Sequence, residues 1–261
     1  MAYQHILYEE KDEIGLLTLN RPAKRNALSR ACEEEIIACL EEAAARHAAK
    51  VIILRGAGDL FCAGHDRSEI LNQPAGEIRR LFHTSVTMMT AIRSAPQCVI
   101  AQVHGIAMAA GCHLAAGCDL ITAGAEHARF GMTGLIYSYN CSTPTVAVSR
   151  AVPQKKCLEM LMTAKLYTAD EAERFGLVNK IFPDASLAED TFAWAREIAQ
   201  SSKYAIAMSK QVFYAQSEMT EWQAYQYAKE MMALAGVSPN ATEGFDAFLN
   251  KRQPTWNDDS F

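Results

Sequence analysis

Short apolar runs alternate with amphipathic stretches through the first half of the chain. Four runs bounded by turn-forming residues predict buried strands, at residues 14–19, 50–54, 98–103 and 120–123. Ser29 opens a stretch with helical spacing whose first turn carries the glutamates 33–35, where a helix dipole favours negative charge. A helix of small residues is expected over 108–117. This repeated strand-then-helix pattern predicts an α/β fold.

The second half of the chain is almost entirely helical in pattern. Two capping boxes are predicted there, at Thr168/Glu171 and Ser186/Glu189. Gly176 is expected to end the helix that begins at Thr168. Three further segments have apolar residues at helical spacing, at 203–217, 220–235 and 240–251. Because no polar linker interrupts the chain, we expect a single unit with a core of residues 1–200 and a C-terminal helical region of residues 201–261.

Composition and charge exclude several classes of partner. The chain has 261 residues, of which 50% are hydrophobic, and a net charge of -5 with no run of Lys or Arg. Nucleic acid and anionic membrane surfaces are therefore not expected as partners. No apolar run is long enough to span a bilayer, and the N-terminus lacks the pattern of a signal peptide. The predicted location is the cytoplasm of a bacterium, or the mitochondrial matrix if the chain is eukaryotic and its leader has been removed.

The eight cysteines indicate a reducing compartment. They contain no C-x-x-C pair, and several lie in apolar surroundings typical of free thiols in a protein core. His104, Cys112, His113 and Cys118 are close in sequence, but their spacing matches no common zinc pattern. No metal site is predicted.

Two glycine-containing segments have the features of a catalytic site. Residues 56–66 leave a buried strand through a glycine-rich turn, and residues 104–113 pass through small residues into a helix N-terminus. Such turns leave backbone N–H groups free to bind a ligand, and the positive end of a helix dipole stabilises an oxyanion. Each segment alone is weak evidence, but the pair, about 45 residues apart, is more specific.

The pair resembles the two oxyanion-hole segments of the crotonase (enoyl-CoA hydratase/isomerase) family, written F-x-x-G-x-D and N-G-x-A-x-G-G-G. Further matches extend over nearly the whole chain: N-R-P at 20–22, N-A-L at 26–28, C-D-L at 118–120, F-G at 130–131, the A-x-E-A-x-x-x-G-L-V-like segment 169–178, and E-G-x-x-A-F-x-x-K-R at 243–252. Residues 141–144 and 149–153 resemble a subgroup of the family, the third of the mitochondrial enoyl-CoA hydratase domain-containing proteins, with its bacterial relatives.

The resemblance implies a ClpP-like spiral of ββα units with a C-terminal helical region for trimerisation, and homotrimers that often pair into hexamers. It also implies an acyl-CoA thioester as substrate, so that coenzyme A enters as part of the substrate and no separate cofactor is expected. Carried over by position, the backbone amides of His65 and Ala110 form the oxyanion hole. The reaction would belong to lipid or fatty acid metabolism.

Other residues are candidates for substrate binding, either by position in the family or by their place in the substrate-facing loop. They are Lys24, Arg25, Ala63, Asp66, Gly134, Tyr137, Cys141, Phe248 and Lys251. Lys24 and Arg25 fall in the loop that approaches the adenine and phosphates of coenzyme A in relatives. Phe248 and Lys251 match a helix that reaches the coenzyme A site of a neighbouring subunit. For the three basic residues, solvated surface charge is an equal alternative.

The two carboxylates that a hydratase of this family uses are both absent. His113 occupies the position of the first, and Gly134 the position of the second. Addition of water to a conjugated double bond needs an acid and a base, so hydratase activity is doubtful. The oxyanion hole survives, because an amide remains at 65 and at 110.

Several side chains could replace the missing carboxylates. His113 is the first choice because imidazole transfers protons near neutral pH, with a structural histidine as the equal alternative. His65 lends its amide whatever its side chain does. Asp66 is expected to cap a helix rather than to act as a base. Tyr137 and Cys141 are expected to shape the acyl pocket, since a nucleophilic Cys141 would need a base that the sequence does not place.

Three functions follow from these residues. The first is an acyl-CoA enzyme, for which double-bond isomerisation fits better than hydration and thioester hydrolysis is also open. The second is a protein that binds acyl-CoA without turnover, as the two missing carboxylates would predict. The third is a structural or RNA-binding trimer, which the acidic composition disfavours.

Overall fold

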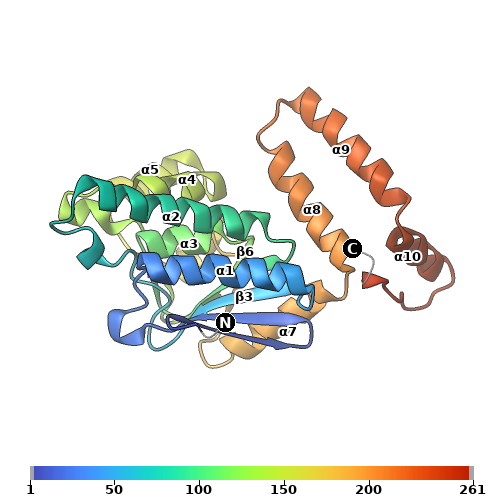
Figure 1. The fold of residues 1–261 in the computed structure, drawn as a ribbon, viewed down its shortest axis with the longest axis horizontal. Coiled ribbons are helices and arrows are strands. Elements are labelled where there is room, and N and C mark those ends of the chain that lie inside the picture. The colour runs from blue at the N-terminus through green and yellow to red at the C-terminus, as the bar shows by residue number, and fades with distance from the viewer. Residues whose placement is uncertain (1–2, 259–261) are drawn as a thin grey trace.

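A mixed six-stranded sheet forms the centre of the molecule (Figure 1). The computed structural model describes residues 3–258. The strands follow the order β1 (Ile6–Lys11), β2 (Ile14–Leu19), β3 (Val51–Gly56), β4 (Cys98–Val103), β6 (Leu120–Gly124) and β9 (Lys180–Phe182). The pair β1 and β2 is an antiparallel hairpin, and all other neighbours are parallel. The four predicted strands are confirmed to within two residues.

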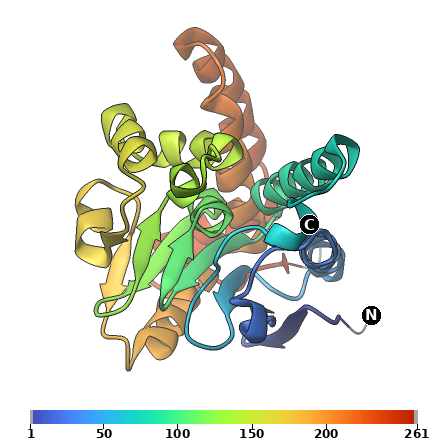
Figure 2. The ribbon, with the colours of Figure 1, turned by 90° about the vertical axis from the view of Figure 1, so that its left-hand side faces the viewer.

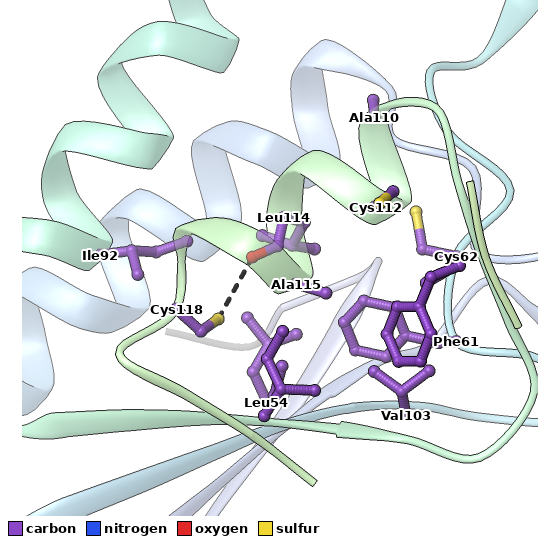
Figure 3. Packing of buried hydrophobic residues seen from close by; sticks show 14 of the residues in the cluster. Leu54, Phe61, Cys62, Ile92, Val103, Ala110, Cys112, Leu114, Ala115 and Cys118 are labelled. Carbon is purple, nitrogen blue, oxygen red and sulfur yellow. Dashed lines mark hydrogen bonds between the residues drawn. The ribbon is translucent and has the colours of Figure 1, made fainter. Parts of the chain in front are cut away.

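Helices cover both faces of the sheet (Figure 2). On one face lie α1 (Arg30–Arg46), α2 (Ala75–Ser94) and α3 (Ala110–Gly117), and on the other lies α7 (Leu187–Ala199). Side chains of β3 alternate between them: Ile52 and Leu54 join the larger core cluster with α1 and α2, while Val51 and Ile53 join the smaller cluster with α7. Figure 3 shows part of the larger cluster beneath α3. Burial on both faces explains the continuous apolar run of this strand.

A second, smaller sheet stands beside the main one. It consists of β5 (Ile106–Met108), β7 (Arg129–Gly131) and β8 (Tyr167–Thr168). The expected helix over 108–117 therefore begins two residues late, because Met108 still pairs with β7. The segments between and after these strands form short helices: η3 (Thr133–Tyr137), α4 (Ser142–Ala151), α5 (Gln154–Thr163) and α6 (Ala169–Arg174).

The C-terminal helices project away from the core (Figure 1). They are α8 (Lys203–Gln216), α9 (Glu221–Gly236) and α10 (Pro239–Leu249), close to the predicted bounds. The predicted division of the chain is into residues 1–200 and residues 201–261. Its outermost residues, 1–2 and 259–261, lie outside the described part of the chain. Among residues 3–258, no helix combines the length and apolarity that crossing a membrane requires.

The predicted helix boundaries have mixed outcomes. The capping box of Thr168 and Glu171 is confirmed, and Gly176, with φ of +87°, follows the end of that helix. The second capping box is wrong. Ser186 stands at the N-cap of α7, but its backbone is in the helical region, its hydroxyl donates to the carbonyl of Pro183 at 3.4 Å, and its side chain makes no capping hydrogen bond.

Helix α3 approaches the segment after β3 at a distance that only glycine allows. A Cβ atom at Gly111 would collide with the carbonyl oxygen of Cys62, and it would stand 2.9 Å from the Cβ of that cysteine. Both groups belong to Cys62, which is fully buried, so neither can move aside alone.

We predict that Gly111→Ala lowers the free energy of unfolding by about 2 kcal/mol, because the added methyl group overpacks this contact. Urea denaturation measures the change. Gly76→Ala is the control, since a Cβ there meets only the guanidinium of Arg80 at 4.0 Å and alanine favours the helix. Equal stability of the Gly111 variant and the wild type would contradict the close approach.

Candidate active site

Backbone pairing brings the two predicted oxyanion segments together. Cys62 forms a parallel bridge with the centre of β5, through hydrogen bonds of 3.0 and 3.1 Å to the two ends of that strand. After this bridge, the backbone of both segments changes direction, and the two turns lie next to each other. Gly64 has φ of +95°, and a Cβ there would stand 3.3 Å from the backbone nitrogen of Ala110. The backbone next to His65 therefore lies against the first residue of α3.

The amides of His65 and Ala110 are both left without an acceptor among residues 3–258. Ala110 is the first residue of α3, where an N–H has no partner within the helix and feels the positive end of the dipole. Leu28 bonds to the residues on either side of His65, accepting from Asp66 and donating to Gly64. Because N–H groups alternate in direction along extended chain, the His65 amide points away from Leu28.

Both residues line one cavity of about 650 Å³. Six of the predicted site residues line it: Ala63, His65, Ala110, Gly134, Tyr137 and Cys141. Ile70, Leu71 and Phe82 supply apolar wall, and the guanidinium of Arg67 lies 4.2 Å from the centre of the Tyr137 ring. Within the described part of the chain, no Asp or Glu lines this cavity. Its lining contains both oxyanion candidates and few ionisable side chains.

The predicted residues for binding coenzyme A do not line the cavity. Lys24 and Arg25 are exposed, but the carbonyl of Arg25 accepts a hydrogen bond from Ala63 at 3.1 Å, so their loop runs beside the first oxyanion segment. Phe248, on α10, has 80% of its surface exposed, and Lys251 is exposed just beyond that helix.

Asp66 also lies outside the lining and has a structural role. Its carboxylate accepts from the amide of Ser68 at 3.2 Å, which caps the short helix η2 (Arg67–Glu69), as predicted. It also pairs with the guanidinium of Arg21 at 2.9 Å. Partial burial would raise the pKa of Asp66, but the hydrogen bonds from Ser68 and Arg21 lower it below its usual value.

His113 is buried behind the wall rather than in it. Its exposed fraction is 6%, and it is absent from the cavity lining. Burial, with the nearby imidazole of His65, lowers the pKa of His113 to about 4. The imidazole is therefore neutral near pH 7, and its residue does not line the cavity.

The position of the second carboxylate, Gly134, has no room for a side chain. A Cβ there would collide with the carbonyl of Tyr139 and stand 2.8 Å from the sulfur of Cys141. That sulfur accepts a hydrogen bond from the Gly134 amide at 3.3 Å. Burial raises the pKa of the Cys141 thiol, so it remains protonated and is a poor nucleophile.

The structure adds two side chains that the sequence did not indicate. The Nε2 atom of His65 lies 2.7 Å from the hydroxyl of Ser85 on α2, and that hydroxyl donates to the carboxylate of Glu33 on α1. Glu33 is fully buried and Ser85 nearly so. The ring of His65 meets the ring of Phe82 edge to face, with centroids 5.0 Å apart. The side chain of His65 is thus held by the Ser85 hydroxyl and by the Phe82 ring.

Ala109, which precedes the second amide, is in a strained conformation. Its φ of 50° and ψ of −116° are values that glycine adopts freely and alanine does not. We predict that Ala109→Gly raises the free energy of unfolding by about 1 kcal/mol, as measured by urea denaturation. Ala116→Gly, within α3, is the control and should lower it by about 1 kcal/mol. A loss of stability in both variants would mean that Ala109 is not strained.

Burial of His113 makes stability depend on pH. Between about pH 6.5 and pH 4, the unfolded chain binds a proton at this residue that the folded chain does not bind. Stability from this group is therefore complete above pH 6.5 and is lost as the pH falls to about 4, by up to about 3 kcal/mol. We predict that His113→Gln flattens this part of the pH profile of unfolding. The exposed His83→Gln is the control, and a profile equally flattened by that variant would contradict the assignment.

The chain is similar to known proteins over nearly its whole length. A family model described as enoyl-CoA hydratase/isomerase matches residues 9–259. The chain is 36% identical to the mitochondrial enoyl-CoA hydratase domain-containing protein 3 of Danio rerio, over 96% of this chain and 86% of that protein. A crystal structure of an enoyl-CoA hydratase from Mycobacterium smegmatis has a TM-score of 0.94 and 39% identity, covering 97% of this chain and 99% of the other. The crystal structure of human enoyl-CoA hydratase domain-containing protein 3 also has a TM-score of 0.94, at 37% identity, covering 97% of this chain and 100% of the other. The predicted crotonase fold is confirmed, and the chain belongs to the enoyl-CoA hydratase/isomerase family.

Proposed function

We propose that this protein is an acyl-CoA enzyme that binds the thioester carbonyl between the amides of His65 and Ala110 and moves a proton along the acyl chain. The observation that supports it most directly is that both amides lack an acceptor among residues 3–258 and that both residues line one cavity. Two preorganised donors stabilise the negative charge that develops on a thioester oxygen when a proton leaves the α-carbon. Family membership supports the acyl-CoA substrate.

Isomerisation of a double bond is the reaction that this site suits best. Hydration requires one group to activate water and another to exchange a proton, and no carboxylate of residues 3–258 lines the cavity. The closed environment of Gly134 leaves no space for a carboxylate side chain at that position. Isomerisation needs only one group that removes a proton and returns it two carbons away. Such a reaction would place the protein in fatty acid metabolism.

The cavity wall favours an acyl chain over a polar ligand. Ile70, Leu71 and Phe82 contribute apolar surface, and the volume of about 650 Å³ suits a small or medium-sized ligand. The loop of Lys24 and Arg25 lies beside the amide of Ala63 and is the proposed site for the phosphates of coenzyme A.

The exposed apolar residues of the C-terminal helices support the proposed homotrimer or hexamer. Large side chains on these helices are more than half exposed, namely Phe213, Trp222, Tyr225, Met232, Leu234, Phe245, Phe248 and Leu249. An apolar surface of this kind is usually covered by another subunit. In that assembly Phe248 and Lys251 would reach the coenzyme A site of a neighbour.

A protein that binds acyl-CoA without turnover is the second candidate, favoured by the absence of carboxylates from the described cavity wall. Incubation with saturated, 2-enoyl and 3-enoyl thioesters separates the two functions. We expect 3-enoyl thioesters to become 2-enoyl thioesters, seen as a rise in ultraviolet absorbance at constant mass. A gain of one water in mass would indicate hydration. Recovery of every thioester unchanged, despite tight binding, would leave the binding function.

The contribution of the second amide can be tested by removing its N–H. Proline is tolerated at the first position of a helix but has no N–H, so Ala110→Pro removes this donor from α3. We predict that kcat falls by about 10²–10³, the usual effect of losing one oxyanion donor. Ala110→Gly keeps the N–H and is the control, with kcat expected within about threefold of the wild type. If both variants, folded by circular dichroism, retain full turnover, the oxyanion role of Ala110 is wrong.

A further inference from the structure

Three buried polar side chains from three separate elements meet at one edge of the cavity. The Nε2 atom of His65 lies 2.7 Å from the Ser85 hydroxyl and 3.5 Å from the Glu33 carboxylate. The side chain of His65 is 10% exposed and that of Glu33 is 0% exposed. His65 and its ring neighbour Phe82 both line the cavity. The cluster therefore joins a fully buried carboxylate to a histidine of the cavity wall.

The hydrogen bonds of the cluster determine which nitrogen of the ring carries the proton. A carboxylate only accepts hydrogen bonds, so the hydroxyl of Ser85 donates its single proton to Glu33. The oxygen of Ser85 must then accept from His65, which requires a proton on Nε2. The other ring nitrogen, Nδ1, has no hydrogen bond within residues 3–258 and keeps a free lone pair. A neutral ring in this tautomer can act as a base through Nδ1.

Burial of the Glu33 side chain is unfavourable for folding, and its position in α1 does not explain why it is there. Its second carboxylate oxygen is buried without a hydrogen bond, and no Lys or Arg of the described chain pairs with it. An unsatisfied buried carboxylate is unfavourable for folding. The N-terminus of α1 is already capped by Ser29, whose side chain accepts from Cys32. Buried charges retained at such a cost are frequent beside catalytic groups.

We propose that the imidazole of His65 is the acid–base group of this site, and that Ser85 and Glu33 position it as the tautomer protonated on Nε2. This inference rests on the proposed function and names its missing catalytic group. Nδ1 takes the proton from the α-carbon of a 3-enoyl thioester, and the electron pair of the broken C–H bond forms a dienolate. The amides of His65 and Ala110 hold its oxygen. Nδ1 then returns the same proton to the γ-carbon, which gives the 2-enoyl thioester.

The surroundings of the ring suit this cycle. When Nδ1 is protonated, the imidazolium faces the Glu33 carboxylate at 3.5 Å, and an opposite charge at this distance stabilises it. The second imidazole nearby, His113, does not compete for the proton, because burial lowers its pKa to about 4. No other described group that faces His65 in the cavity lining is acidic.

The test replaces the carboxylate while keeping its shape. In Glu33→Gln, the amide can donate to the Ser85 oxygen, and the serine proton is then free to turn toward Nε2 of His65. We expect the ring to change to the tautomer protonated on Nδ1, which long-range ¹H–¹⁵N spectra of the histidine rings detect. Turnover, and exchange of the α-proton of a saturated acyl-CoA in deuterium oxide, should fall at least about 100-fold. In serine proteases, loss of the carboxylate that sets the tautomer of histidine costs about 10⁴.

Matched variants separate this role from a structural one. Glu34→Gln makes the same change one residue away on the exposed side of α1, and it should leave the tautomer and the exchange rate unchanged. His65→Ala should abolish exchange but bind acyl-CoA within about threefold of the wild type, because its amide remains. Ser85→Ala removes the link to Glu33 and should also lose exchange, which provides a second variant if Glu33→Gln does not fold.

The outcomes distinguish this inference from the proposed function. A wild-type ring protonated on Nδ1, a Glu33→Gln ring with the wild-type tautomer, or exchange retained within about threefold in His65→Ala would each overturn the role of the cluster. A wild-type protein that exchanges α-protons but converts no 3-enoyl thioester supports the cluster and overturns isomerisation. A wild-type protein that binds acyl-CoA without exchange overturns both.

Discussion

The parallel pairing of Cys62 with β5 is the interaction on which the site depends. It sets two segments, one after β3 and one after β4, side by side just before each exposes an amide. Two glycines of the second segment, one before β5 and one after it, permit this close approach. A Cβ at Gly111 would collide with the carbonyl of Cys62, and a Cβ at Gly105 would collide with the carbonyl of Asp59. Two short pieces of backbone, held at this distance, provide donors that no side chain has to supply.

Motif residues outside the cavity hold the first of these segments in place. The side chain of Asn26 donates to the carbonyls of Ala57 and Leu60 at 2.8 and 2.9 Å, and a ring nitrogen of His104 lies 2.9 Å from the carbonyl of Gly58. The family motif has asparagine at the position of His104. The imidazole ring of His104 nevertheless reaches the glycine turn. These residues therefore act as a support for the oxyanion backbone rather than as ligands.

The sequence was informative where burial gave a continuous pattern, and less so elsewhere. Strands such as residues 51–54 are buried on both faces, so their continuous apolar sequence is enough to predict them. Strand β1 escaped prediction because only Ile6 among its residues is buried, and β5 because three residues show no period. Motif spacing located both amides. It could not indicate Glu33 or Ser85, since the three side chains of the cluster are separated by 20 and 52 positions and meet only after α1 and α2 pack together.

In the proposed function, loss of the two family carboxylates changes the chemistry without dismantling the site, because the groups proposed to bind the carbonyl and the group proposed to move protons come from different parts of the chain. Backbone amides persist under substitution, so Ala110 serves where the family has glycine. Acid–base groups depend on where their side chains point, and here position 113 is buried and position 134 is closed. His65, linked through Ser85 to the buried carboxylate of Glu33, is the proposed proton-transfer group on one side of the substrate. One such group is sufficient for shifting a double bond and insufficient for adding water across it.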